Sequence, residues 1–350
     1  MFLYHTIECL KDSTLRDNSR HLAGILFKNT ILNTTKDEEF VQIWEKMTEE
    51  QRELLKNGSL EALGDSNLNV IRAAGSCISA ICIHEIPNKR WLEVLELLCS
   101  HWTHETRNVR IASIVTLGYI WEELLPTELE KESSDFVITA FLDSLTAHYE
   151  DYELIKETIQ GIYHSLKFTV SHFKNDQGKL IIEKIIDAAS YPNIAVREIA
   201  MQWIVEVVRL CYDYIGDFMV QITECTINAC KKDKEEVKTQ AIEVWSSIAE
   251  EENMRDEKNI GHFHFINTAF EVLIEMIQET IQDISVGNEE LDEEQQWGTS
   301  VAAASCLSLI SLVVKDKVVQ PMTEFVAQMI KDENDWKMKY CGIVALGAIL

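Results

Sequence analysis

The stretch Val196-Arg197-Glu198-Ile199-Ala200 carries the motif that decides the fold: an apolar residue and a basic residue, closely followed by alanine. Close variants recur along the chain at Val70-Ile71-Arg72-Ala73-Ala74, Val109-Arg110-Ile111-Ala112, Ile155-Lys156-Glu157-Thr158, Val237-Lys238-Thr239-Gln240-Ala241 and Met338-Lys339-Tyr340-Cys341. The first five basic residues are separated by 38, 46, 41 and 41 residues. This period is typical of two-helix units that stack into a solenoid.

The composition supports an all-α solenoid of HEAT or armadillo type. Only 4 Pro and 13 Gly occur among 350 residues, so few residues interrupt helices. A single unit carries too little apolar surface to bury its own face, so neighbouring units must stack. We therefore predict one continuous HEAT-repeat array over residues 1–350, coiled into a right-handed superhelix with a concave inner wall that binds proteins.

The chain is strongly acidic, with 58 acidic and 32 basic residues and a formal net charge of −26. This charge repels nucleic acids and anionic lipids and favours a basic partner. An acidic surface also keeps a long solenoid in solution, so the charge by itself leaves both interpretations open.

The cysteines and the longest apolar run bear on compartment and membrane. The nine cysteines form no C-x-x-C pair and mostly lie among apolar neighbours, which indicates buried, reduced thiols and a cytosolic or nuclear compartment. The apolar run 301–314 has 14 residues, which is too short to span a bilayer. We therefore expect no membrane insertion.

No pattern of catalytic residues or metal ligands stands out. His101 and His104 share a helix face, and His262 and His264 lie near a predicted loop, but neither pair has further ligands at a suitable spacing. Phosphate-binding, dinucleotide-binding and nucleophile motifs are missing from the sequence as well. We expect a protein that is not an enzyme and that needs no cofactor or metal.

Two segments interrupt the helical pattern. The mixed-charge segment 250–259 is interpreted as a solvated connection. The segment 288–297 places five carboxylates within 289–294 and ends at Trp297. Like charges this close do not stabilise a helix. The segment is interpreted either as a solvated loop or as a site for a basic helix, with the indole stacking on a cation.

Several ordered segments resemble the importin-β family of nuclear import receptors. The run 77–91, Cys-Ile-Ser-Ala-Ile-Cys-Ile-His-Glu-Ile-Pro-Asn-Lys-Arg-Trp, resembles a family repeat in which an E-I-P turn closes a helix and a Trp follows. Segments 23–29, 117–120 and 242–246 are similar to the family's A-G-x-x-x-K-N, I-G-Y-I and I-E-x-W-S. Asp335-Trp336 and Ala345–Leu350 resemble the repeat beyond the acidic segment, so the resemblance extends nearly end to end.

The resemblance implies a function in transport rather than catalysis. Family members bind basic import signals or an importin-α-type adaptor, contact Phe-Gly nucleoporins and release cargo when Ran-GTP binds. The chain is then expected to be a monomer in the cytoplasm, in the nucleus and at nuclear pores, without binding nucleic acid directly. The alternative is a HEAT-repeat scaffold outside nuclear transport, such as a phosphatase scaffold or an adaptin-like protein.

The resemblance also implies binding residues. A Phe-Gly pocket on two neighbouring outer helices would use Ile138, Thr139, Leu142, Ile181 and Ile182, unless these residues only pack repeat against repeat. Ran would contact the inner helices at Lys28 and Asn29, although Asn29 also suits a helix end. Ran or an adaptor would contact the acidic segment at Glu289, Glu290, Asp292, Glu293, Glu294 and Trp297.

The chain departs from the family pattern in several places. It begins near the end of the family's first outer helix and stops within a repeat, so it resembles an amino-terminal portion. Gly178 stands where the family pocket has a Glu. The acidic segment is interrupted by Leu291 and diluted by Gln295 and Gln296, and Gly298 replaces an Asn.

Overall fold

The computed structural model describes residues 2–33, 44–128, 131–170, 173, 176–286, 293–331 and 336–350, without the side chains of 33, 131–133, 283–286 and 293–297. Every regular element in these ranges is a helix, which confirms the predicted all-α class. Contacts divide the chain into two compact units, Met1–Ser171 and His172–Leu350. Each unit is described separately below, and the single continuous array stays a prediction.

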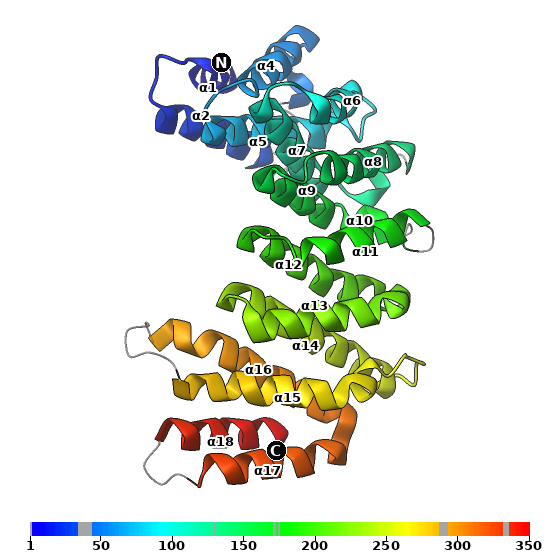
Figure 1. Cartoon of the computed structure of the whole chain (residues 1–350). Coiled ribbons are helices and arrows are strands. Elements are labelled where there is room, and N and C mark those ends of the chain that lie inside the picture. Colours follow the sequence, from blue (N-terminus) through cyan, green and yellow to red (C-terminus); the bar gives the residue numbers. More distant parts are fainter. Residues whose placement is uncertain are drawn as a thin grey trace. The chain divides into compact units, whose positions relative to one another are not determined.

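The first unit is built from helix pairs, each made of an A helix and a B helix (Figure 1). The B helices of successive pairs pack against one another in the order α2, α5, α7, α9. The A helices are α1 (Phe2–Lys11), α4 (Glu49–Ala62), α6 (Glu93–Ser100) and α8 (Lys131–Ala147); the B helices are α2 (Asp17–Asn33), α5 (Leu68–Glu85), α7 (Arg107–Glu123) and α9 (Tyr152–His164). Short helices η1 (His101–Thr103), η2 (Pro126–Glu128) and α10 (Leu166–Thr169) lie in the connections.

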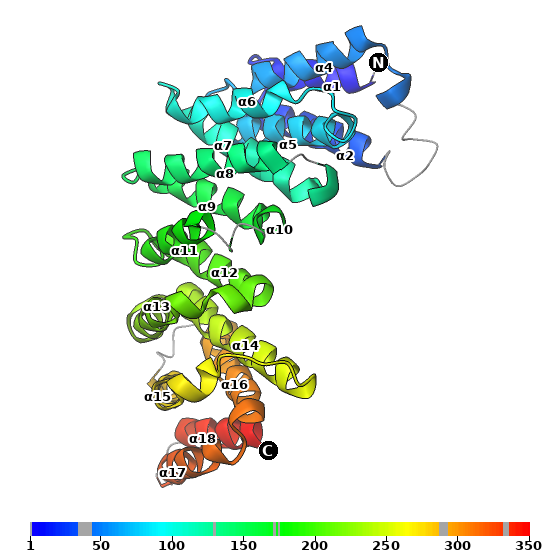
Figure 2. The ribbon, with the colours of Figure 1, turned by 90° about the vertical axis from the view of Figure 1, so that its right-hand side faces the viewer.

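The second unit repeats this plan, and Figure 2 shows it from another side. Here the B helices pack in the order α12, α14, α16, α18. The A helices are α11 (Asp176–Ala188), α13 (Met219–Lys232), α15 (Phe265–Val286) and α17 (Val319–Met329); the B helices are α12 (Ile194–Cys211), α14 (Glu235–Glu257), α16 (Glu293–Val314) and α18 (Trp336–Ile349). The connections contain η4 (Tyr212–Tyr214), η5 (Gly216–Phe218) and η6 (Lys315–Val318).

The recurring motif lies in the first turns of B helices. Some of its basic residues donate hydrogen bonds to backbone carbonyls of the preceding turn. Arg110 Nη1 donates to the carbonyl oxygens of His104 and Glu105 at 2.6 and 3.1 Å. Arg197 Nη1 donates to the carbonyls of Tyr191 and Pro192, both at 2.8 Å. Backbone carbonyls left without partners in a turn are satisfied by these guanidinium groups. The sequence period is therefore the period of the A-to-B turns.

Arginine and aspartate join one turn to the next. Arg197 Nε and Nη2 donate to both carboxylate oxygens of Asp233, at 2.6 and 2.7 Å. Arg107 in the same way holds Asp151, the N-cap of α9, at 2.7 Å. The hydrogen bonds from Arg197 hold the pKa of Asp233 below its ordinary value. Bidentate pairs of this kind fix the rotation of one repeat on its neighbour.

Glycines let the B helices of the first unit approach closely. A Cβ built on Gly24 in α2 would lie 2.7 Å from Ala73 Cβ in α5, and one on Gly75 in α5 would lie 2.6 Å from Thr116 Oγ1 in α7. Gly118 of α7 faces Gly161 of α9, with 3.4 Å between its built Cβ and the Gly161 Cα. Gly24 and Gly118 belong to segments that carry the family resemblance, so those segments mark helix crossings.

The E-I-P turn after α5 surrounds a buried carboxylate. Glu85 is 1% exposed, accepts a hydrogen bond from Trp44 Nε1 at 2.9 Å and pairs with Lys56 at 2.7 Å and Arg90 at 3.0 Å. Lys89 and Trp91 adopt positive φ angles of 56° and 57°, which residues with a side chain rarely do. The buried carboxylate and its partners hold this strained turn in place.

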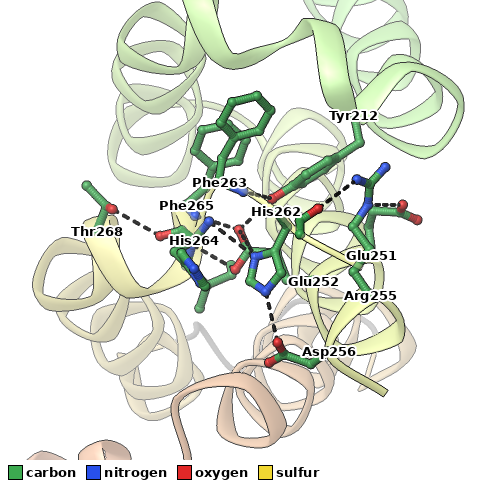
Figure 3. A network of polar contacts seen from close by, with 12 residues as sticks. Tyr212, Glu251, Glu252, Arg255, Asp256, His262, Phe263, His264, Phe265 and Thr268 are labelled. Carbon is green, nitrogen blue, oxygen red and sulfur yellow. Dashed lines mark hydrogen bonds and ion pairs between the residues drawn. The ribbon is translucent and has the colours of Figure 1, made fainter. Parts of the chain in front are cut away.

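The segment 250–259 is not the solvated connection that its charges suggested. Helix α14 continues to Glu257, and Glu252 is fully buried. Figure 3 shows its carboxylate accepting hydrogen bonds from Tyr212 Oη at 2.8 Å and from the backbone nitrogen of Phe265, at the start of α15. Burial raises the pKa of Glu252, and these hydrogen bonds only partly oppose it. A charged residue on α14 thus caps the next helix.

One continuous helical stretch, Gly298–Met329, is long and apolar enough by composition to cross a membrane. It runs from within α16 through η6 to the end of α17, and Lys315 has a φ of 53°, so the chain turns between the two α-helices. Core helices of folded proteins pass the same test. The contacts of α16 with α14, α15 and α18 identify it as a B helix packed in the repeat array.

Candidate functional site

The expected Phe-Gly residues on α8 are largely covered. Ile138 is 1% exposed and Leu142 is 7% exposed, and both belong to the core that α8 forms with α6 and α9. Thr139 lies exposed on the same helix, with its hydroxyl donating to the carbonyl of Asp135 at 2.8 Å. The i,i+4 spacing puts both aliphatic side chains on one face of α8, and that face packs into the core.

The expected residues on α11 are covered too. Ile181 is 1% exposed and Ile182 is 2% exposed, and Gly178 is buried beside them. The exposed side of α11 carries Leu180, which is 41% exposed, and Lys179, whose Nζ lies 3.3 Å from Asp217 Oδ2. A phenyl ring would reach the two isoleucines only after neighbouring side chains move. Their role in binding therefore stays a proposal.

Lys28 and Asn29 lie on α2, away from its ends. Lys28 is one-third exposed, and its Nζ is 3.7 Å from Glu123 Oε1 at the end of α7. Asn29 is exposed four residues before the end of α2, so it does not cap this helix. Both residues belong to the B layer, as the expected inner position requires.

The acidic segment falls partly outside the described residues. Glu289, Glu290 and Asp292 lie there, whereas Glu293, Glu294 and Trp297 belong to α16, whose backbone begins at Glu293. The segment is therefore not a loop throughout. Carboxylates in the first turn of a helix interact favourably with the free backbone N–H groups and the helix dipole, and this offsets their mutual repulsion.

Ion pairs in the first unit bridge B helices that are two repeats apart. Arg72 Nη2 in α5 lies 3.0 Å from Glu157 Oε1 in α9, although α7 packs between these helices. Lys28 of α2 reaches Glu123 of α7 across α5 in the same way. Packed helix axes are about 8–10 Å apart, so side chains reach across two such steps on the concave side of a layer. The B layer is thus the inner, charged wall of this unit.

The sequence contained only part of this information. Arg72 belongs to the recurring motif, but its partner Glu157 was recognised only as part of another copy of that motif. Pairing across two repeats depends on the curvature of the layer, which no local pattern encodes. The resulting wall carries both signs of charge on partly exposed side chains, which suits recognition of a folded, charged protein surface.

Comparison with known proteins relates the chain to one family. Residues 1–65 match the model of the importin-beta N-terminal domain. The chain is 27% identical to importin subunit beta-1 of Arabidopsis thaliana over 95% of its length, and 26% identical to that of Schizosaccharomyces pombe over 97%. It spans 39% and 41% of those two proteins.

Solved structures share the fold. A crystal structure of importin beta superposes with a TM-score of 0.89 at 23% identity, covering 99% of this chain and 41% of that one. Yeast Kap95p studied with RanGDP gives a TM-score of 0.88 at 22% identity, and the complex of Kap95 with Nup1 gives 0.85 at 23%. Each of these covers 99% of this chain and 41% of the other. The HEAT-repeat solenoid predicted from the sequence is thereby confirmed.

Proposed function

From its homology with the amino-terminal part of importin subunit beta-1, we propose that this chain is a nuclear transport receptor or a portion of one. It would bind basic import signals or an importin-α-type adaptor, contact Phe-Gly nucleoporins and release its cargo on binding Ran-GTP. The observation that carries the proposal is the sequence similarity over 95% of the chain. No catalytic step is part of it, and it places the protein in the cytoplasm, in the nucleus and at nuclear pores.

The charged inner wall supports binding of Ran. Lys28 pairs with Glu123 and Arg72 pairs with Glu157 in the first unit, where a protein surface can exchange its own charges with these pairs. Kap95p, a structural relative, was solved with RanGDP. The proposed release requires Ran-GTP to bind more tightly than Ran-GDP, since only differential affinity shifts an equilibrium.

The net charge supports a basic partner. A chain with a formal charge of −26 attracts Lys- and Arg-rich segments over a range that physiological salt limits to about 8 Å. The carboxylates from Glu289 to Glu294 would act on the rate of association, and Trp297 would slow dissociation by stacking on a cation. Nucleoporin contact at Thr139, Ile138, Leu142, Ile181 and Ile182 completes the proposal.

Binding measurements on the purified chain test this function. We expect tighter binding of GTP-loaded than GDP-loaded Ran, and binding of both a Phe-Gly peptide and a basic adaptor peptide. Equal affinity for the two Ran forms, or no binding of any of these ligands, contradicts the proposal. A HEAT-repeat scaffold outside nuclear transport would bind none of them.

The acidic segment has its own test. Changing Glu289, Glu290, Asp292, Glu293 and Glu294 to their amides should slow association of the basic peptide and flatten its dependence on salt. The matched control converts five exposed carboxylates elsewhere, Asp143, Glu150, Asp187, Glu224 and Glu271, and so changes the net charge equally. Identical salt slopes for the two variants in stopped-flow measurements would assign the effect to net charge alone.

A further inference from the structure

Helix α2 carries apolar side chains on two opposite faces, and one of these faces is exposed. The helix packs on α1 and α5 and stands at the end of the row of B helices in the first unit (Figure 1). Ala23 and Phe27 lie on its buried side. On the other side Leu22 is 54% exposed, Ile25 is 37% exposed and Leu26 is 43% exposed. A helix with apolar side chains on opposite faces is normally covered on both.

The exposed face of α2 has the spacing of a coiled-coil seam. Steps of three and four residues alternate along it. This spacing keeps side chains on one side of a helix, so that a second helix can pack along the line that they form. Leu26 lies directly beside this line. The α2 seam is defined by this spacing and consists of Leu15, Asn18, Leu22, Ile25, Asn29 and Leu32.

The α2 seam is uncharged, although the chain has a net charge of −26. Asp17, the one acidic residue of α2, is turned toward the N-cap of α5, where its Oδ2 accepts a hydrogen bond from Asn67 Nδ2 at 2.7 Å. Lys28 also lies off the seam, with its Nζ 3.7 Å from Glu123 Oε1 in α7. A strongly basic or acidic segment would find no counter-charge on the seam. The surface that covers it is therefore expected to be apolar and uncharged as well.

The α2 seam is complementary to a second copy of itself. In an antiparallel pair centred between Leu22 and Ile25, each Leu22 faces the partner's Ile25. In the same register each Asn18 faces the partner's Asn29, and the two amides can donate and accept hydrogen bonds with one another. The ends of the seam match in this register too. An interface with two-fold symmetry has to be self-complementary in this way.

The asparagines select this arrangement. A shift of one helical turn would set Asn18 or Asn29 against aliphatic side chains, where a buried amide without a partner costs about 1–3 kcal/mol. In an antiparallel pair the positive end of one helix dipole lies beside the negative end of the other, whereas a parallel pair would bring like ends together. Register and direction are thus both specified by α2 itself.

The length of the seam sets the strength of the contact. A helix of 17 residues is about 25 Å long, and one side of it covers less than the roughly 800 Å² that each partner contributes to a stable interface. Because α2 is already held by α1 and α5, pairing requires no further folding. The charge of −26 on each copy opposes association, and salt screens this repulsion. A weak dimer is expected, favoured by high protein concentration and by salt.

We propose that the α2 seam packs antiparallel against the α2 seam of a second copy of this chain. This inference goes beyond the proposed function and does not depend on it. It also differs from the monomer that the family resemblance implies.

Helix α18 provides the matched comparison. It ends the row of B helices in the second unit, and it also exposes aliphatic side chains, with Ile343 at 66% and Leu346 at 42%. If α2 of one copy packed on α18 of the next, copies would add without limit, because a head-to-tail contact of this kind does not close. The number of copies in the assembly therefore distinguishes the two pairings.

Sedimentation velocity on the intact chain tests the pairing. From about 1 to about 500 µM protein in about 150 mM NaCl, we expect monomer to give way to dimer without larger species. Leu22→Ser and Ile25→Ser should each raise the dissociation constant at least about tenfold, because every substitution removes two contacts from a symmetric dimer. Ile343→Ser is the control and should leave it unchanged. All three side chains are exposed, so the variants should keep wild-type circular dichroism.

Cysteine cross-linking tests the direction of the pair. The background is Cys9→Ser, which removes the exposed native thiol. The Asn18→Cys and Asn29→Cys variants are mixed and treated with dipyridyl disulfide, which takes up the two electrons and two protons released when two thiols join. We expect the mixture to form covalent dimers much faster than either variant does alone, since only residues 18 and 29 of different copies are neighbours.

The contrary outcomes are equally definite. A chain that stays monomeric at every concentration overturns the proposal, and so does a dimer that both serine variants leave unchanged. Open-ended growth, or loss of association in Ile343→Ser, would assign the contact to α18 instead. Cross-linking of either single variant with itself at the rate of the mixture would overturn the antiparallel arrangement.

Discussion

Arg197 joins three segments of the second unit, since it holds the carbonyls of Tyr191 and Pro192 and both carboxylate oxygens of Asp233. Lysine has a single ammonium group and cannot satisfy both sets of acceptors. We expect Arg197→Lys to lower the free energy of unfolding by about 1–3 kcal/mol, measured by urea denaturation. Arg209→Lys is the control, because Arg209 and Glu243 are both more than 40% exposed and such pairs contribute about 0–1 kcal/mol. Equal losses in the two variants would show that the turn does not depend on Arg197.

Glu252 makes the stability of the second unit depend on pH in an unusual direction. Burial raises its pKa above the ordinary 4.5, so the folded chain binds this proton more readily than the unfolded chain. Its contribution is complete below the ordinary pKa and is lost as pH rises through the folded pKa. We therefore expect the wild type to gain stability relative to Glu252→Gln as the pH falls from about 7.5 to about 5.

Thermal denaturation at several pH values checks this expectation for Glu252. Glu271→Gln, at an exposed position of α15, should follow the wild type throughout. If the difference in thermal midpoint between the wild type and Glu252→Gln stays constant across this pH range, the Glu252 carboxylate is ionised in the folded chain at no cost in stability. Tyr212→Phe removes one hydrogen bond to the carboxylate and should raise its pKa further.

At the scale of elements, glycines decide how closely the B helices pack. Gly24→Ala would place a Cβ 2.7 Å from Ala73 Cβ, which cannot rotate away, so α2 and α5 must separate. We expect a loss of about 1–3 kcal/mol in the free energy of unfolding, the usual effect of overpacking. Gly347→Ala in α18 meets nothing within 4 Å and should stabilise by up to about 1 kcal/mol, because alanine favours helix. A destabilising Gly347→Ala together with a neutral Gly24→Ala would contradict this packing.

Local sequence patterns predicted a helix correctly where a residue makes the same contacts in more than one repeat. The basic residues of the motif mark B helices because a guanidinium group fits the carbonyls of the A-to-B turn, as Arg110 and Arg197 show. Local patterns failed to predict burial where contacts with other helices decide whether a side chain is covered. Glu252 looks like a surface charge until Tyr212 and the start of α15 surround it, and the apolar spacing of Ile138 and Leu142 does not tell whether their face is covered.

Some features of the candidate site could be predicted from the sequence, and others could not. The position of Lys28 and Asn29 on an inner helix was implied by the family resemblance, and both residues lie on the B helix α2. The pairing of Lys28 with Glu123 was not predictable, since it depends on the distance between helices that are far apart in sequence. For the acidic segment, charge repulsion suggested a loop, whereas the helix dipole favours the two glutamates that begin α16.

At the scale of the molecule, the net charge of −26 opposes folding through repulsion among carboxylates. Salt screens this repulsion more than it weakens the partly buried ion pairs, because screening acts on exposed charges. The thermal midpoint should therefore rise when NaCl increases from about 20 to about 200 mM at neutral pH. Sucrose at matched osmolality controls for exclusion effects. A midpoint that falls with salt would show that surface ion pairs outweigh the repulsion.

The cysteines differ in exposure, so the rate at which each thiol is alkylated should report how often its helix opens. Cys9 on α1 is exposed, whereas the other eight thiols are buried on helices of both units. Burial raises the pKa of Cys99, Cys211, Cys225, Cys230 and Cys306 to about 12, so almost no thiolate is present to react at neutral pH. A maleimide should modify Cys9 within the mixing time, and each buried thiol only when its helix opens. The alkylation rates then rank the repeats by local opening, in one native sample and without a single substitution.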